Sequence, residues 1–221
     1  DSGIDAVAAS SSSVTSGSFT VGSGSNRYML VAVLWNDAFA GDYDVSNVKW
    51  GGSGGTALTA VGAATINNTL KMRVYRLIAP TSQTSTVFAD ITGSVARLAV
   101  IAMSYTGVDQ TTPIGTPTIT SPETDTPSGT QTLGTDEWIV GYLQTEGNTI
   151  TQGTQNQRNE DENSAEMSVS GDDYTSGTLS WTTTGVFDRN IVWVVNLKPA
   201  AGGGGGLAIP VAMNQYRQRR A

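Results

Sequence analysis

The chain of 221 residues contains neither cysteine nor histidine. It therefore has no thiol nucleophile, no disulfide, no zinc site of the usual ligand type and no imidazole for proton transfer near neutral pH. Charged residues make up only 14% of the chain, and no apolar run reaches the roughly 18–20 residues that span a bilayer. These absences exclude much enzyme chemistry and predict that no segment spans a membrane.

Threonine, serine and glycine are abundant instead, at 30, 22 and 26 residues. Threonine and other β-branched residues fit pleated strands, and glycine supplies the positive φ of tight turns. A helical bundle would use alanine, leucine, glutamate and lysine. The composition therefore predicts an all-β fold.

The formal net charge of −7 is unevenly distributed. The last fifteen residues carry Arg217, Arg219 and Arg220 and no acid, so the rest of the chain has a net charge of −10. An acidic body does not attract nucleic acid. We expect no nucleic-acid binding by the main domain.

Strand-like segments alternate with turn clusters along most of the chain. The segment 70–78 alternates with period two, which places Leu70, Met72 and Val74 on one face and Lys71 and Arg73 on the other. About ten such strands, with no useful helical periodicity, predict a two-sheet antiparallel sandwich of jelly-roll type. The most apolar segments are 27–35, 96–105, 137–145 and 190–197. Because apolar strands lie at both ends of the span, we expect a single domain over 17–200.

The remaining segments have distinct compositions. Residues 1–16 are small and polar and predict an N-terminal arm. The proline-rich stretch 111–130 predicts an edge or surface excursion, because proline cannot donate to a central ladder. Residues 146–164 predict a polar loop. The five glycines within 201–206 form a flexible spacer.

The last segment, 207–221, has two interpretations. It is either a disordered tail or a docking peptide whose alternate apolar residues add to a sheet edge or fill a groove on a neighbouring subunit. We favour docking, with a basic end that meets an acidic surface. The expected docking residues are Leu207, Ile209, Val211, Met213, Tyr216, Arg217, Arg219 and Arg220.

Catalytic groups are few. Lys49, Lys71 and Lys198 are the only lysines that could pair with a serine, and all lie in or beside strands, where a solvated face explains them better. A glycosidase would need two acids. The candidate acidic cluster is Glu160, Asp161, Glu162 and Glu166. Within it, glycosidase activity would depend on Glu160, Glu162 and Glu166. Polar neighbours on every side make that cluster a solvated loop, so the sequence predicts no catalytic site.

Hard oxygen ligands for calcium need neither cysteine nor histidine. Asp37, Asp42 and Asp44 crowd one predicted loop and are weak candidates for a structural calcium, while Asp172 and Asp173 are expected in another. EF-hand spacing is absent, and acids in turns mostly cap their own backbone. We therefore expect no cofactor, and calcium in a structural role is the metal that this sequence could bind.

Exposed aromatic rings could bind sugar by stacking. Most tryptophans lie within apolar strands and belong to the core. The possible glycan contacts are Tyr43, Trp50 and Tyr174, which lie in loops or beside the glycine-rich turn 51–55. That turn has no following Lys-Ser or Lys-Thr pair, so it is a hairpin and not a phosphate loop.

Four sequence motifs resemble those of a known protein module: NRYMLVAVLW, VKWGGSGGTALTAVG, MRVYRLIAP and SYTGVDQTTPIG. The segment NLKP near the end of the chain resembles its closing strand. Over about 18–115, the chain resembles a β-sandwich module of tailed-phage virion proteins and bacterial surface proteins. The resemblance implies a structural role and brings no catalytic set. We expect a non-enzymatic virion protein, a capsid decoration or tail-associated subunit that forms homo-oligomers and is found in virions or outside cells. The alternative is an extracellular carbohydrate-binding or adhesive module.

Overall fold

The computed structural model describes residues 2–7, 11–37, 42–67, 69–146, 149–163, 167–184 and 189–201. These residues form twenty strands and no helix, and every ladder between strands is antiparallel. The predicted all-β class is confirmed. Among the described residues no helix is long and apolar enough to cross a membrane.

Four sheets make up most of the structure, each named here by the half of the chain that supplies it. The N-terminal inner sheet runs β1 (Ser2–Val7), β12 (Arg97–Tyr105), β4 (Tyr28–Asn36), β9 (Leu70–Ile78) and β7 (Thr59–Ala60), with β8 (Thr65–Asn67) also paired to β9. The N-terminal outer sheet runs β2 (Ser11–Thr15), β11 (Val87–Val95), β5 (Val45–Trp50) and β6 (Thr56–Ala57).

The C-terminal inner sheet runs β13 (Thr118–Thr120), β20 (Asn190–Leu197), β15 (Trp138–Thr145), β18 (Met167–Tyr174) and β17 (Asn156–Asn163). The C-terminal outer sheet runs β14 (Ser128–Thr130), β19 (Thr178–Thr184) and β16 (Thr149–Gln152). A short separate ladder joins β3 (Phe19–Thr20) to β10 (Thr84–Ser85).

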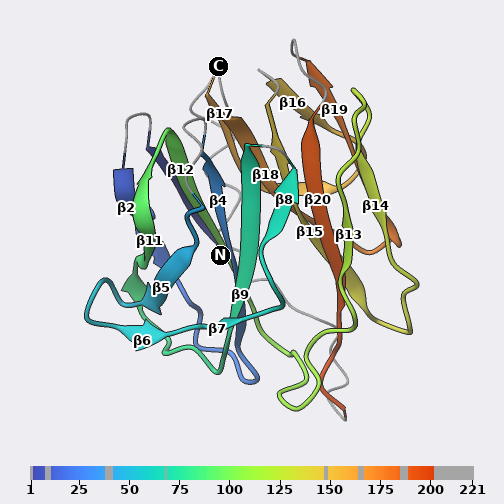
Figure 1. Ribbon diagram of the computed structural model, residues 1–221. Helices are drawn as coiled ribbons and strands as arrows, with labels where there is room; N and C mark the ends of the chain where they lie inside the picture. The colour runs from blue at the N-terminus through green and yellow to red at the C-terminus, as the bar shows by residue number, and fades with distance from the viewer. Residues whose placement is uncertain are drawn as a thin grey trace, which may run out of the picture.

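The four sheets lie in layers, with the two inner sheets in the middle (Figure 1). One apolar cluster, which includes Leu30, Ile101 and Trp193, fills the space between the two inner sheets. A second cluster lies between the N-terminal inner and outer sheets, and a third lies between the C-terminal inner and outer sheets. The structure is therefore sandwich-like, with three apolar layers between four sheets.

This layering explains the most apolar segments of the sequence. The central strands of each inner sheet are covered on both faces, so they need apolar residues at consecutive positions. All nine residues of β4 are buried, and β20 is buried throughout. Strands of the outer sheets have one covered face, and β19 accordingly alternates between exposed and buried residues.

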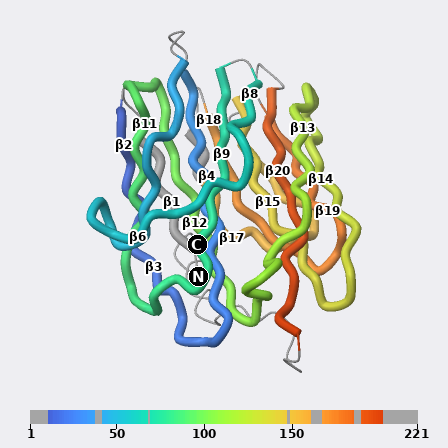
Figure 2. The backbone as a smooth tube through the Cα atoms, turned by 60° about the horizontal axis from the view of Figure 1, so that its bottom comes forward, coloured from blue at the N-terminus to red at the C-terminus, as the bar shows by residue number. Residues whose placement is uncertain are grey.

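The same interleaved strand order occurs in both halves of the chain. In the first half, β1-β12-β4-β9 forms the inner sheet and β2-β11-β5-β6 the outer one. In the second half, β13-β20-β15-β18 and β14-β19-β16 repeat this order, except that β17 joins the inner sheet and leaves the outer sheet with three strands. Figure 2 shows the two halves on opposite sides of the molecule.

Polar contacts also join the halves. The Gln144 side-chain amide donates to the carbonyl of Trp35 at 2.9 Å, and the Asn67 amide donates to the carbonyl of Asn190 at 2.9 Å. At the other end of the strands, the Asp109 amide donates to the carbonyl of Lys198 at 2.9 Å. The halves are thus fixed against each other at both ends of their shared apolar layer.

Three sequence predictions need correction. The N-terminal arm over 1–16 is wrong, because β1 pairs with β12 and β2 pairs with β11 through backbone hydrogen bonds that need no large side chains. The polar loop over 146–164 is also wrong, because β16 and β17 occupy most of it. The prediction of about ten strands in two sheets is too low, because the sequence pattern does not reveal the short edge strands.

Close packing of the inner sheets makes Gly171 on β18 sensitive to substitution. A Cβ atom there would lie 2.9 Å from Cγ2 of Ile101 across the apolar layer. We expect Gly171→Val to lower the free energy of unfolding by about 1–3 kcal/mol, measured by urea denaturation, because the sheets must separate to admit it. Gly54→Val is the matched control, since a Cβ there meets nothing within 4 Å. Equal losses in both variants would contradict the packing argument.

Candidate functional site

The most unusual chemistry in the described residues is a pair of adjacent buried acids, Asp172 and Asp173, near the end of a strand in the C-terminal half. Both lie on β18 and both are 0% exposed. Successive residues of a strand point to opposite faces. Asp173 therefore faces the layer between the two inner sheets, and Asp172 faces the C-terminal outer sheet.

Asp173 is held by a cation from the neighbouring strand β17. The guanidinium of Arg158 donates to both carboxylate oxygens of Asp173, at 2.7 Å each. The hydroxyl of Tyr105 on β12 donates to the same carboxylate at 3.2 Å, and the amide of Asn156 donates at 3.2 Å. Two parallel N–H···O bonds form the strongest kind of side-chain ion pair. The negative charge of Asp173 is thereby neutralised.

A register irregularity in β17 positions that cation. The pairing of β17 with β18 shifts between Gln157 and Asn159, which leaves Arg158 opposite no residue of its own. Such bulges redirect a side chain out of the normal alternation. Burial raises the pKa of the Tyr105 hydroxyl, and the nearby Asp173 charge raises it further, so Tyr105 remains a hydrogen-bond donor.

Among the described residues, Asp172 has no basic partner. Its Oδ2 atom accepts hydrogen bonds from the hydroxyl of Ser170 at 2.5 Å and from Nε1 of Trp181 at 2.8 Å. Its Oδ1 atom is buried and has no hydrogen-bond partner among the described residues. Burial raises the pKa of Asp172 to about 7, and repulsion from Asp173 and Glu160 acts in the same direction.

Further oxygen-bearing groups surround Asp172. The amide of Gln152 on β16 donates to the carboxylate of Glu160 on β17, and it lies 3.4 Å from the hydroxyl of Ser170. That hydroxyl also lies 3.3 Å from the carbonyl of Asn159. We call these five residues, Asp172, Ser170, Glu160, Gln152 and Asn159, the Asp172 cluster. It joins three strands at the β16–β17 edge of the second half.

The acids predicted as weak calcium ligands lie elsewhere and have basic partners. The ammonium of Lys71 lies 2.6 Å from Asp37 and 3.7 Å from Asp42, and the guanidinium of Arg73 lies 2.8 Å from Asp44. These acids therefore divide between two cations. No group of three or more acidic residues that could hold a metal occurs among the described residues.

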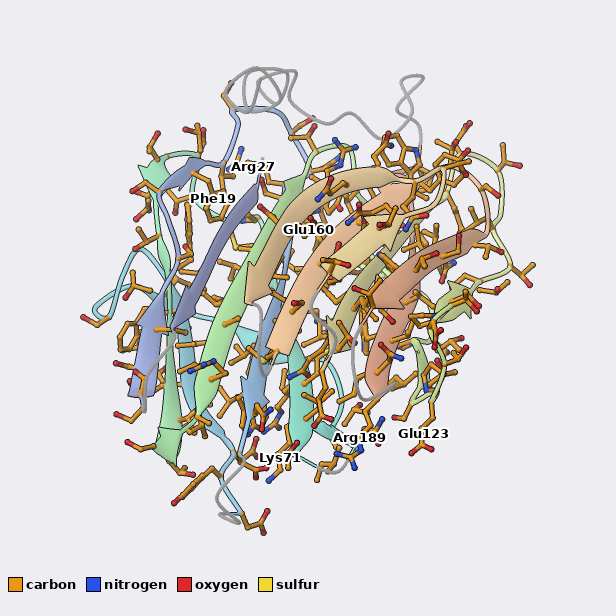
Figure 3. The ribbon with its side chains drawn as sticks, turned by 90° about the horizontal axis from the view of Figure 1, so that it is seen from above. Phe19, Arg27, Lys71, Glu123, Glu160 and Arg189 are labelled. Carbon is orange, nitrogen blue, oxygen red and sulfur yellow. The ribbon has the colours of Figure 1, made fainter. Side chains whose placement is uncertain are left out.

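The position of Lys71 differs from the one predicted from the sequence. It was expected on a solvated face, yet it is 6% exposed and is buried together with Asp37. Its position at the end of β9, on the face opposite Leu70, is consistent with the predicted alternation. Figure 3 shows Lys71 and Arg189 well apart from Glu160, so the two groups of charges are separate.

The predicted aromatic platform is largely absent. Trp50 is 1% exposed, its ring packs at a tilt against Phe19 with ring centroids 4.9 Å apart, and its Nε1 atom donates to the carbonyl of Thr81 at 3.3 Å. Its prediction as a glycan contact is wrong, because Trp50 ends β5 with its side chain inside the apolar cluster between the N-terminal sheets, which leaves no exposed ring face for a sugar. Tyr43 and Tyr174 are partly buried, and each packs against an apolar cluster.

Other predicted residues cannot be placed. The docking segment 207–221, Glu166 and the side chains of Asp161 and Glu162 lie outside the described residues. Of the acids proposed for a glycosidase, only Glu160 is therefore described, and it lies on a strand where a loop was expected.

Sequence reasoning missed the buried acids because it placed Asp172 and Asp173 in a loop. One signal was available. Arg158 is the only basic residue between 147 and 188, a stretch that contains seven acids. A single cation in such a stretch indicates a specific partner.

Comparisons with known proteins return nothing for this chain: no family model matches it, and neither the curated proteins nor the solved structures give a match. The geometry of the residues therefore carries the functional argument.

We predict that Asp172 makes stability depend on pH in the opposite sense to an ordinary carboxylate. Between pH 4 and pH 7 the folded chain keeps a proton on Asp172 that the unfolded chain has lost, so the free energy of unfolding falls as the pH rises through this window. Asp172→Asn should remove this contribution and should be more stable than the native chain at pH 8 by about 1–4 kcal/mol. Urea denaturation of both chains from pH 4 to pH 8, in metal-free buffer, measures the difference. The prediction is wrong if the free energy of unfolding changes with pH in the same way in both chains.

We predict that Arg158 is essential to the fold of the second half. Arg158→Met leaves the Asp173 carboxylate buried without its cation and should lower the free energy of unfolding by about 3–5 kcal/mol. Arg73→Met is the control, because its partner Asp44 has a side chain that is 53% exposed, and its loss should be at most about 1 kcal/mol. Thermal unfolding of the two variants tests this, and a similar loss in both would show that burial of Asp173 does not matter.

Proposed function

We propose that the chain is a non-enzymatic structural protein of a virion, a capsid decoration or tail-associated subunit, found in the virion or outside cells. The observation that carries this proposal is the interleaved strand order that occurs twice. We infer that each half is a jelly-roll sandwich, one of the architectures that form viral capsid and lectin domains. Two such sandwiches packed through their inner sheets provide a stiff building block.

The distribution of polar chemistry supports a structural role. Several charged groups serve internal ion pairs, as in Lys71 with Asp37 and Arg158 with Asp173. Ion pairs of this kind hold neighbouring strands together, and the charged groups in them serve the fold. The resemblance of 18–115 to virion and surface modules points the same way.

Assembly is assigned to the C-terminal segment. With residues 1–16 largely in strands, the polyglycine spacer and 207–221 are what remains of the predicted arms. The segment combines alternate apolar residues with three arginines, and the rest of the chain is acidic. Opposite charges favour docking of this segment on another copy or on a neighbouring virion protein.

The alternative, an extracellular carbohydrate-binding or adhesive module, has less support. Lectin domains also use jelly-roll sandwiches. A stacking platform needs an exposed ring, however, and of the three aromatic residues proposed for it only Tyr43 and Tyr174 keep part of their surface exposed. No observation on the described residues favours glycan binding over assembly.

We predict that deleting 202–221 abolishes self-association and leaves the body folded. The full chain should sediment as an oligomer, and the truncated chain as a monomer with an unchanged circular dichroism spectrum, because the deletion removes only the docking segment. Sedimentation velocity measures this.

A charge control separates the two parts of the docking segment. Replacing Arg217, Arg219 and Arg220 with glutamine should weaken association and make it less sensitive to salt, because the apolar positions remain while the electrostatic contribution is lost. A full chain that is monomeric would overturn docking of the segment on another copy, and a truncated chain that still forms the same oligomer would overturn the assignment of assembly to this segment.

A further inference from the structure

We propose that the Asp172 cluster binds a hard divalent cation of the calcium type, held between β16, β17 and β18. The cluster offers the carboxylates of Asp172 and Glu160, the hydroxyl of Ser170, the side-chain amide of Gln152 and the carbonyl of Asn159. The two carboxylates, the hydroxyl and the carbonyl present oxygen, which is the ligand atom that calcium prefers. The Gln152 amide, whose nitrogen faces Glu160 and Ser170, would present its oxygen after rotation of its terminal amide group.

The buried Oδ1 atom of Asp172 points to such a ligand independently of the acid count. Asp172 is 0% exposed, and Oδ1 has no hydrogen-bond partner among the described residues, although Oδ2 of the same carboxylate has two. A buried polar atom without a partner is strongly unfavourable. A cation beside Oδ1 would satisfy it.

The two faces of β18 differ in how acid is neutralised. On the inner face, Arg158 binds Asp173 through both carboxylate oxygens. On the outer face, Asp172 has a hydroxyl and an indole N–H as its hydrogen-bond donors, and neither carries a positive charge. A cation on the outer face would neutralise the charge of Asp172, as Arg158 neutralises the charge of Asp173.

The composition of the site selects the class of cation. The chain has no histidine or cysteine, which disfavours zinc and other soft or borderline metals. Magnesium requires near-ideal octahedral geometry and keeps much of its water, whereas calcium accepts irregular sets of carboxylate and neutral oxygens. Glu160 and Gln152 are only partly buried, so they offer the ion an approach at the strand edge.

Terbium luminescence is a direct probe of this site. Terbium replaces calcium at oxygen sites, and it emits when an excited tryptophan lies nearby. Nε1 of Trp181 is 2.8 Å from Oδ2 of Asp172, so a bound ion would have an energy donor next to it. We expect a saturable signal in the full chain, displaced by calcium at or below about 1 mM, and a higher melting temperature with calcium than with EDTA.

Three variants make the test specific. Asp172→Asn and Glu160→Gln should each weaken terbium binding by about tenfold or more, and the second also tests the site should the first fold poorly. Asp42→Asn should bind as the native chain does, because Asp42 belongs to the separate group around Lys71. The proposal is overturned by a signal that does not saturate, by binding that survives both cluster variants, or by binding that Asp42→Asn removes. These outcomes are independent of oligomer formation, so they do not bear on the proposed assembly role.

Discussion

The apolar layer between the two inner sheets is the constraint on which the rest of the structure depends. It brings together side chains from both halves of the chain, including Leu30, Ile101 and Trp193. Since each inner sheet also packs against its own outer sheet, the central strands β4, β12, β15 and β20 are buried on both faces. Burial of this kind is favourable roughly in proportion to apolar area. It also forces any polar group inside the layers to find a partner within the protein.

That requirement explains where the polar groups lie. Gln144 meets a backbone carbonyl of the other half, and Asp173 meets both a guanidinium and a tyrosine hydroxyl. These groups lie toward the ends and edges of the strands, where the sheets can admit them. The middle of the layer holds leucine, valine, isoleucine and aromatic residues. Polar contacts thus fix how the halves are aligned, while apolar burial supplies the attraction between them.

The sequence was informative where one physical signal dominated. Continuous apolar runs located β4, β12, β15 and β20, and strict alternation located β9 and the residues that share each of its faces, although the face with Lys71 is covered and not solvated. Polar strands were missed, because the chain 156–163 carries acids, amides and one arginine with no apolar alternation. Its strand character comes from pairing with β18 and from burial of Arg158 against Asp173. Both are tertiary effects that local composition does not encode.

The edge strand β17 is therefore held differently from the rest of the body. The central strands are held mainly by apolar burial, whereas β17 adds charged contacts on both faces of β18 to its backbone ladder with that strand. On one face Arg158 brings its own positive charge to Asp173, and that pair is complete. On the other face Glu160 approaches Asp172, and two carboxylates near each other are stable only when a proton or a cation accompanies them. Solution conditions can thus act on this edge while the apolar layers keep the remaining strands in place.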